Sequence, residues 1–276
     1  MVKFTLSMVA LCGAVSALPG VDPALARRSL LDPSDFTIVP SKSSPQGYFK
    51  AYKTGGLKRY GAKTDNDHEI VKRWTCDTSS TYTSGDNDNG GKGISIRNTA
   101  PDKQCYYLIH NSCDKVPWKH ICVDSGDTRF VSFPDRWEGR IQRGVDQYML
   151  GGQPQWLGSW FEVSWDQNGW GWADLSLIRG NDGGVVLTSA DGSNARKGYS
   201  QWVLDGAPGD AYDQKADGVR VIAATERLDG SINTAARDWN LNKVGAENAY
   251  CDDYHGNPVI AATNGRFSTE WPAGRP

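Results

Sequence analysis

The sequence predicts an all-β domain, either a sandwich or a barrel. Short apolar or alternating segments follow one another from residue 93 onwards, and Asp-Gly turn signals separate them at 182–183, 191–192, 205–206 and 229–230. No long segment shows the 3.6-residue period of an amphipathic helix. Short strands between frequent glycine turns are typical of β-sandwiches and barrels.

The expected strands can be placed in chain order. Residues 93–98, with the sequence GISIRN, alternate apolar and polar side chains, which is typical of a half-buried strand. The same pattern, or a short apolar run, predicts strands at 105–110, 129–133, 139–142, 185–189, 201–204 and 219–225. The polar segment 77–92 is expected to be a loop, and residues 228–248 could hold one short helix.

A β-hairpin is predicted at the centre of the domain, in segment 157–178, around the Asn-Gly turn signal at 168–169. A two-residue turn would mix apolar and charged side chains on one face. A three-residue loop that ends at a left-handed Gly169 pairs Glu162 with Asp174 and separates an apolar face from an acidic one. We choose this register, because a slip of one residue moves every side chain to the other face. The apolar face would hold Phe161, Val163, Trp165, Ala173, Leu175 and Leu177.

The first 73 residues are expected to be a secretory signal and a leader. Residues 1–17 combine Lys3, an apolar core and a small-residue cleavage site after Ala17, as signal peptides do. Residues 18–73 contain ten Lys and Arg against six Asp and Glu, and all 11 Trp follow them. They end at the dibasic pair Lys72-Arg73, so we expect a propeptide cleaved before Trp74. The alternative is a disordered leader that is never removed.

The charge of segment 74–276 excludes several partners. This segment holds 19 basic and 26 acidic residues, which gives a net charge of −7. Nucleic acids and anionic membranes attract basic surfaces, so neither is an expected partner. Uncharged polysaccharide fits better. The segment also contains no phosphate-binding loop and no nucleophile-elbow motif, and we expect a secreted monomer that needs no cofactor.

Cysteine usage agrees with secretion and argues against a metal site. Five cysteines follow the signal segment, at positions 76, 105, 113, 122 and 251. An odd number allows at most two bridges within the chain, so we expect one or two disulfides and a leftover thiol. A local loop is expected among Cys105, Cys113 and Cys122, with the pairing left open. The spacings contain no zinc-ligand motif, so no metal is expected.

Two acids and two tryptophans on the hairpin predict a carbohydrate site. Glu162 and Asp174, opposite each other on neighbouring strands, would repel and raise the pKa of one carboxyl, which suits glycoside hydrolysis. Trp170 and Trp172 share their face and could stack on pyranose rings. The structural alternatives are that the acids bind an arginine, such as Arg140, Arg143 or Arg179, and that the tryptophans pack under a loop.

Four stretches of the chain resemble the thaumatin-like superfamily, in particular its secreted fungal members. They are GISIRNTAPDKQCYYLIHNSC, FPDRWEGRIQRG, SWFEVSWDQNGWGWADLSLIRG and AYCDDYHGNPVIAATNG, which span most of residues 93–265 in the family's order. The third stretch is the most specific. The resemblance implies a β-sandwich with loop-rich extensions and an acidic cleft, in a family where some members bind or cleave β-1,3-glucans.

The resemblance also implies which residues form the cleft. The family's Glu falls on Glu162, its first Asp on Asp174, and its Arg on Arg140 or Arg143. The next cleft Asp falls on Arg179, which departs from the family pattern, and a further one could be Asp205 or Asp210. Members of the family usually have many more than five cysteines.

We therefore expect segment 74–276 to be a thaumatin-like β-domain that acts on cell-wall glycan. It would bind β-1,3-glucan, with a weak endo-glucanase activity in which Glu162 donates a proton and Asp174 stabilises the transition state or activates water. Arg140, Arg143, Arg179, Trp170 and Trp172 would complete the binding surface. The alternative is a non-enzymatic secreted interaction, effector or antimicrobial protein, which the arginine at 179 would favour.

Overall fold

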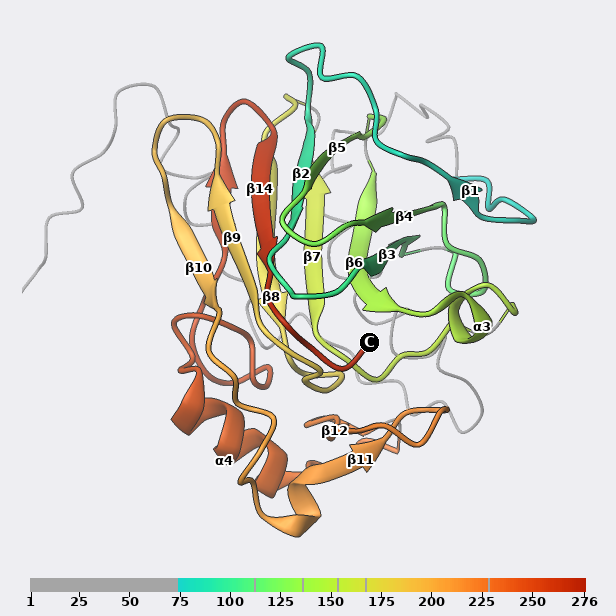
Figure 1. Ribbon diagram of the computed structural model, residues 1–276. Coiled ribbons are helices and arrows are strands. Elements are labelled where there is room, and N and C mark those ends of the chain that lie inside the picture. Colours follow the sequence, from blue (N-terminus) through green and yellow to red (C-terminus); the bar gives the residue numbers. More distant parts are fainter. Residues whose placement is uncertain (1–73, 112, 136, 153, 167, 228) are drawn as a thin grey trace, which may run out of the picture. The chain divides into compact units, whose positions relative to one another are not determined.

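The fold is all-β, as the sequence predicts. The computed structural model describes residues 74–111, 113–135, 137–152, 154–166, 168–227 and 229–276. Two large sheets dominate this part of the chain (Figure 1). The expected signal peptide at 1–17 and leader at 18–73 lie outside the described residues. Within the described ranges, no helix is long and apolar enough to span a membrane.

The larger sheet has seven strands in the order β1-β4-β3-β6-β7-β8-β13. Only β1 and β4 run parallel, and every other neighbouring pair is antiparallel. The strands are β1 (Thr81–Tyr82), β4 (Lys119–Val123), β3 (Gln104–His110), β6 (Glu138–Gly144), β7 (Trp160–Trp165), β8 (Gly171–Ser176) and β13 (Ile260–Ala262).

The second sheet has five strands in the order β10-β9-β14-β2-β5. They are β10 (Arg196–Tyr199), β9 (Val185–Ser189), β14 (Arg266–Trp271), β2 (Gly93–Asn98) and β5 (Thr128–Ser132). The two sheets face each other across one hydrophobic core, in which Tyr106 of the first sheet lies 4.8 Å from Trp271 of the second, between ring centroids. Phe161 and Phe267 make a similar contact at 6.4 Å. The domain is therefore a β-sandwich.

Smaller elements gather at one end of the sandwich, where Figure 1 shows α4, β11 and β12 together. Strands β11 (Tyr212–Gln214) and β12 (Arg220–Ile222) pair with each other, after the short 3₁₀ helix η2 (Gly209–Ala211). Helix α4 (Thr234–Lys243) confirms the short helix expected there, and the Asn233 side chain caps it by accepting the Ala236 N–H. A one-turn helix, α3 (Asp146–Met149), follows β6.

Most of the predicted strands are confirmed, and the differences have a physical cause. Residues 201–204 form no strand, although Val203 and Leu204 are buried. Their apolar side chains reach the core from a loop, and an apolar run alone does not distinguish the two cases. The strand expected at 219–225 is only three residues long. Strands β1, β4, β10, β11, β13 and β14 were not predicted.

The predicted hairpin register is confirmed. Glu162 lies opposite Asp174, and Gly169 is in the left-handed conformation with φ of +81°. The Asp166 carboxylate organises the loop, because it accepts the backbone N–H groups of Asn168 and Trp170. All six side chains of the predicted apolar face lie in the core.

Two disulfides close loops at one side of the larger sheet. Cys105 pairs with Cys122 across β3 and β4, which confirms the local loop expected from their spacing. Cys76 pairs with Cys113. Cys251 is the odd cysteine; it is buried, and its thiol is free.

Candidate functional site

The candidate site begins with a row of charged side chains across the larger sheet. Pairing between the strands places Arg140 of β6 opposite Glu162 of β7, and Glu162 opposite Asp174 of β8. Side chains alternate along each strand, so this row lies on the face turned away from the hydrophobic core. Three of the residues that the sequence assigned to the cleft, Arg140, Glu162 and Asp174, are therefore neighbours on one face.

Arg140 is held in an aromatic enclosure. Its guanidinium carbon lies 4.2 Å from the ring centroid of Trp160 and 4.9 Å from that of Trp156, within cation–π range. The side chain is fully buried, donates to Gln142 Oε1 at 2.9 Å, and lies 3.4 Å from a carboxylate oxygen of Asp114. Desolvation lowers the pKa of Arg140 to about 10, still far above neutral pH, so the guanidinium remains charged.

Glu162 and Asp174 share a desolvated site but have different surroundings. Desolvation raises the pKa of Glu162 to about 7, while the positive charges of Arg140 and Arg179 and a hydrogen bond from Ser176 oppose that rise. Desolvation and the charge of Glu162 raise the pKa of Asp174 well above its usual range. The Asp174 Oδ1 atom is buried and has no hydrogen-bond partner among the described residues. The two positive charges therefore favour ionisation of Glu162, while the charge of Glu162 opposes ionisation of Asp174.

Arg179 connects this pair to a second group of acids. It follows β8, is almost fully buried, and donates from Nη1 to the backbone oxygen of Glu226 at 2.6 Å. Desolvation lowers the pKa of Arg179 to about 10, while the negative charges of Glu162 and Asp253 raise it. The sequence suggested that Arg179 would neutralise Asp174. In the structure, the positive charge of Arg179 interacts with the negative charges of Glu162 and Asp253.

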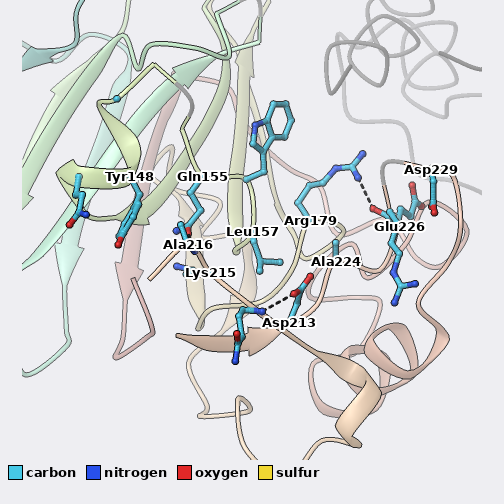
Figure 2. A pocket seen from close by; sticks show the side chains of 15 residues that line it. Tyr148, Gln155, Leu157, Arg179, Asp213, Lys215, Ala216, Ala224, Glu226 and Asp229 are labelled. Carbon is cyan, nitrogen blue, oxygen red and sulfur yellow. Dashed lines mark hydrogen bonds between the residues drawn. The ribbon is translucent and has the colours of Figure 1, made fainter. Parts of the chain in front are cut away.

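An open groove of about 750 Å³ lies beside these acids (Figure 2). Arg179 and Glu226 stand in its wall, and Trp156 lines it as well as enclosing Arg140. Figure 2 shows Tyr148 and Gln155 toward one end of the groove and Arg179, Glu226 and Asp229 toward the other. The remaining lining residues are Gln147, Gly151, Leu157, Asp213, Gln214, Lys215, Ala216, Ala224 and Arg227.

Glu226 and Asp253 belong to the site but were missed in the sequence. Glu226 is 6% exposed and lies just beyond β12, while Asp253 lies in the loop before β13. No motif marks Glu226, and Asp253 lies within the fourth stretch of the resemblance, which assigned it no role in the cleft. Both residues lie in loops that are distant in sequence and meet only through the fold. Asp205 and Asp210, the acids suggested by the resemblance, are both exposed, and neither lines the groove.

The structure does not bring every predicted residue to the site. Arg143 faces the core: it donates to the backbone oxygens of Asp182 at 3.0 Å and Gly184 at 2.6 Å, so its role is structural. Trp170 and Trp172 are partly exposed on the hairpin, on the Glu162 side of the sheet, but do not line the groove. Trp156 and Trp160 are the indoles that contact the charged row.

The arrangement can exchange protons near neutral pH. Several carboxyls with raised pKa values lie beside two buried guanidinium groups, and such perturbed groups are common where proteins carry out acid–base chemistry. No cluster of three or more His, Cys, Asp or Glu within the described ranges has the arrangement of a metal site.

Comparison with known proteins does not assign a family. No protein family and no curated protein matches the chain. Among solved structures, the protein elicitor MoHrip2 from Magnaporthe oryzae is similar over 40% of this chain and 78% of its own, at 14% identity and a TM-score of 0.28. Similarity at this level does not establish a shared fold, and membership of the thaumatin-like superfamily remains a hypothesis.

Proposed function

We propose that this domain binds neutral cell-wall glycan, β-1,3-glucan in the first instance, and hydrolyses it weakly. The observation that carries the proposal is the position of the Glu162–Asp174 pair beside an open groove lined by aromatic and polar side chains. Glycan-active sites need both features, a surface that holds sugar rings and carboxyls in different protonation states.

The lining of the groove supports sugar binding. Tyr148 and Trp156 offer flat apolar faces on which pyranose rings can stack. Gln147, Gln155 and Gln214 supply amide donors and acceptors that match sugar hydroxyls. Charged residues of both signs also line the groove, so the lining does not favour a ligand of one particular charge over a neutral one.

The acids support hydrolysis. Cleavage of a glycosidic bond requires one carboxyl that is protonated and one that is ionised. The environments of Glu162 and Asp174 separate their pKa values in this way, because the two arginines stabilise charge on Glu162 alone. The activity is expected to be weak, since the Asp174 Oδ1 atom is buried and neither acid lines the groove itself.

The proposal places the protein outside the cell as a thaumatin-like domain. The two disulfides within the domain support export, because such bonds persist in oxidising compartments. The β-sandwich and the acid row support the thaumatin-like assignment. N-terminal sequencing of the secreted protein tests the leader: a mature start at Trp74 agrees with the proposal, and a start at Leu18 contradicts removal of the leader.

A non-enzymatic interaction or antimicrobial protein is the second candidate. It is favoured by Arg179, which stands at the position where the family has an acid. The positive charge of Arg179 acts on Glu162 and Asp253. If the guanidinium groups hold Glu162 ionised and no other acid donates a proton, the groove binds without cleavage.

One experiment separates these functions. The purified protein is incubated with insoluble β-1,3-glucan, and both its depletion from solution and the released reducing ends are measured. Glu162→Gln should bind but release no ends, and Tyr148→Ala in the groove should bind roughly tenfold more weakly. Tyr82→Ala, on the exposed strand β1, is the matched control and should behave like the unaltered protein.

Depletion without release of reducing ends would establish binding and contradict the hydrolase. If the protein neither binds nor cleaves the glucan, the glycan proposal is wrong, and a protein target becomes the better hypothesis.

A further inference from the structure

Glu226 is a buried acid in the wall of the groove, which the exposed Asp213 and Asp229 also line. Its residue is 6% exposed, and the side chain lines the groove, whereas Glu162 and Asp174 do not. The segment that carries it is fixed on both sides: the Glu226 backbone oxygen accepts from Arg179, and its Oε1 accepts the Asp253 N–H at 3.1 Å. The carboxyl is therefore held in one orientation in the wall.

The second oxygen of this carboxyl is open to a ligand. Oε2 forms no hydrogen bond or ion pair with any residue in the described ranges, and it is not among the buried polar atoms. A carboxyl that is nine-tenths buried, with one oxygen tethered and the other facing a groove, has the arrangement of a group that exchanges a proton with a bound molecule.

We propose that Glu226, rather than Asp174 or Glu162, is the proton donor to a glycan in this groove, with Glu162 as the base. The proposal rests on the hydrolytic function proposed above and names Glu226 as the carboxyl that acts together with Glu162. Asp174 becomes a positioning residue: it lies opposite Glu162 on β8, with a buried Oδ1 that a ligand in the groove does not reach.

The neighbouring charges differ between the two glutamates: a base is favoured by positive neighbours, and a proton donor by negative ones. Arg140 and Arg179 both stabilise the ionised form of Glu162. Glu226 has acidic neighbours: its own burial and the negative charges of Asp253 and Asp252 raise its pKa to about 7, against the tethering N–H of Asp253. The pKa of each glutamate lies at about 7, so both exchange protons near neutral pH; positive neighbours favour the ionised form of Glu162, and negative neighbours favour the protonated form of Glu226.

The reaction step follows from these roles. Glu226 gives its proton to the glycosidic oxygen, and the bond from that oxygen to the anomeric carbon breaks, its electron pair remaining on the oxygen. Water adds to the anomeric carbon, and the proton that it loses passes to the Glu162 carboxylate. Glu162 acts through water because it does not line the groove. Proton exchange with solvent then restores both groups.

Substrates with different leaving groups test the assignment. Reducing-end release from β-1,3-glucan is measured for the unaltered protein, Glu226→Gln and Glu162→Gln, together with cleavage of an aryl β-glucoside whose leaving group, a dinitrophenolate, needs no protonation. Glu226→Gln should lose about 100-fold or more on glucan and less than about tenfold on the aryl substrate. Glu162→Gln should lose activity on both.

The outcomes are distinct. If Glu226→Gln cleaves glucan as well as the unaltered protein, or loses both substrates equally, Glu226 is not the proton donor. Unchanged depletion by insoluble glucan shows that the variant is folded and still binds. If the unaltered protein cleaves neither substrate, the hydrolytic function fails, and this assignment fails with it.

Discussion

Replacing Glu226 with glutamine should reduce the pH dependence of folding stability. Burial and neighbouring acids raise the pKa of Glu226 from 4.5 to about 7 in the folded chain. Because the folded pKa is the higher one, the stabilising contribution is complete below about pH 4.5 and is lost as the pH rises through about 7. A shift of this size corresponds to about 3 kcal/mol, since each pKa unit is worth about 1.4 kcal/mol.

Glutamine resembles the protonated side chain and can still accept the Asp253 N–H through its amide oxygen. The variant and the unaltered protein should therefore be similarly stable at about pH 5. At about pH 8 the variant should be more stable, by about 2 to 3 kcal/mol, because only the unaltered protein holds a charge in this wall.

Urea unfolding at both pH values, followed by tryptophan fluorescence, measures the difference. Glu270→Gln is the control, since that carboxylate is partly exposed on β14. Parallel pH profiles for Glu226→Gln and the unaltered protein would show that Glu226 titrates normally, and this reasoning would then be wrong. A variant that is less stable at about pH 8 would show that the ionised form is stabilised by a partner instead.

Three further predictions concern the scaffold. Replacing Cys105 and Cys122 with serine should lower the unfolding free energy by about 3 kcal/mol, as measured by chemical denaturation. The two cysteines are 17 residues apart in sequence, and without the bond the unfolded chain between them is no longer closed into a loop, so its entropy rises. Gly171→Ala should cost about 1 to 3 kcal/mol by the same method, since its new Cβ would lie 2.4 Å from the Phe267 ring. Native Cys251 should not react with an aromatic disulfide reagent until the protein unfolds, because burial raises its thiol pKa to about 12; immediate reaction would contradict this.

The hairpin was predictable because its two faces differ so strongly. Every second residue of β7 and β8 is apolar, so only one register buries them all, and that register places Glu162 opposite Asp174. Strands β2, β3, β5 and β6 were also predictable, through local alternation or short apolar runs. The sequence was less informative at 201–204, where apolar side chains enter the core without strand pairing.

The other half of the site could not be predicted in the same way. Glu226 and Asp253 come from loops, and only the packing of β12 and the segment before β13 brings them toward Arg179. Arg143 shows the opposite case. Its spacing of three from Arg140 places the two side chains on opposite faces of β6, a consequence of strand alternation that the resemblance to a family motif does not settle.

The central claim is that the groove beside Glu162 binds β-glucan, and a depletion isotherm tests it most directly. Purified protein is mixed with increasing amounts of insoluble β-1,3-glucan, with and without a soluble β-1,3-linked oligosaccharide as competitor. Our account predicts saturable depletion that the competitor reverses and that Tyr148→Ala weakens. Depletion that the competitor does not affect, or no depletion at all, would contradict it.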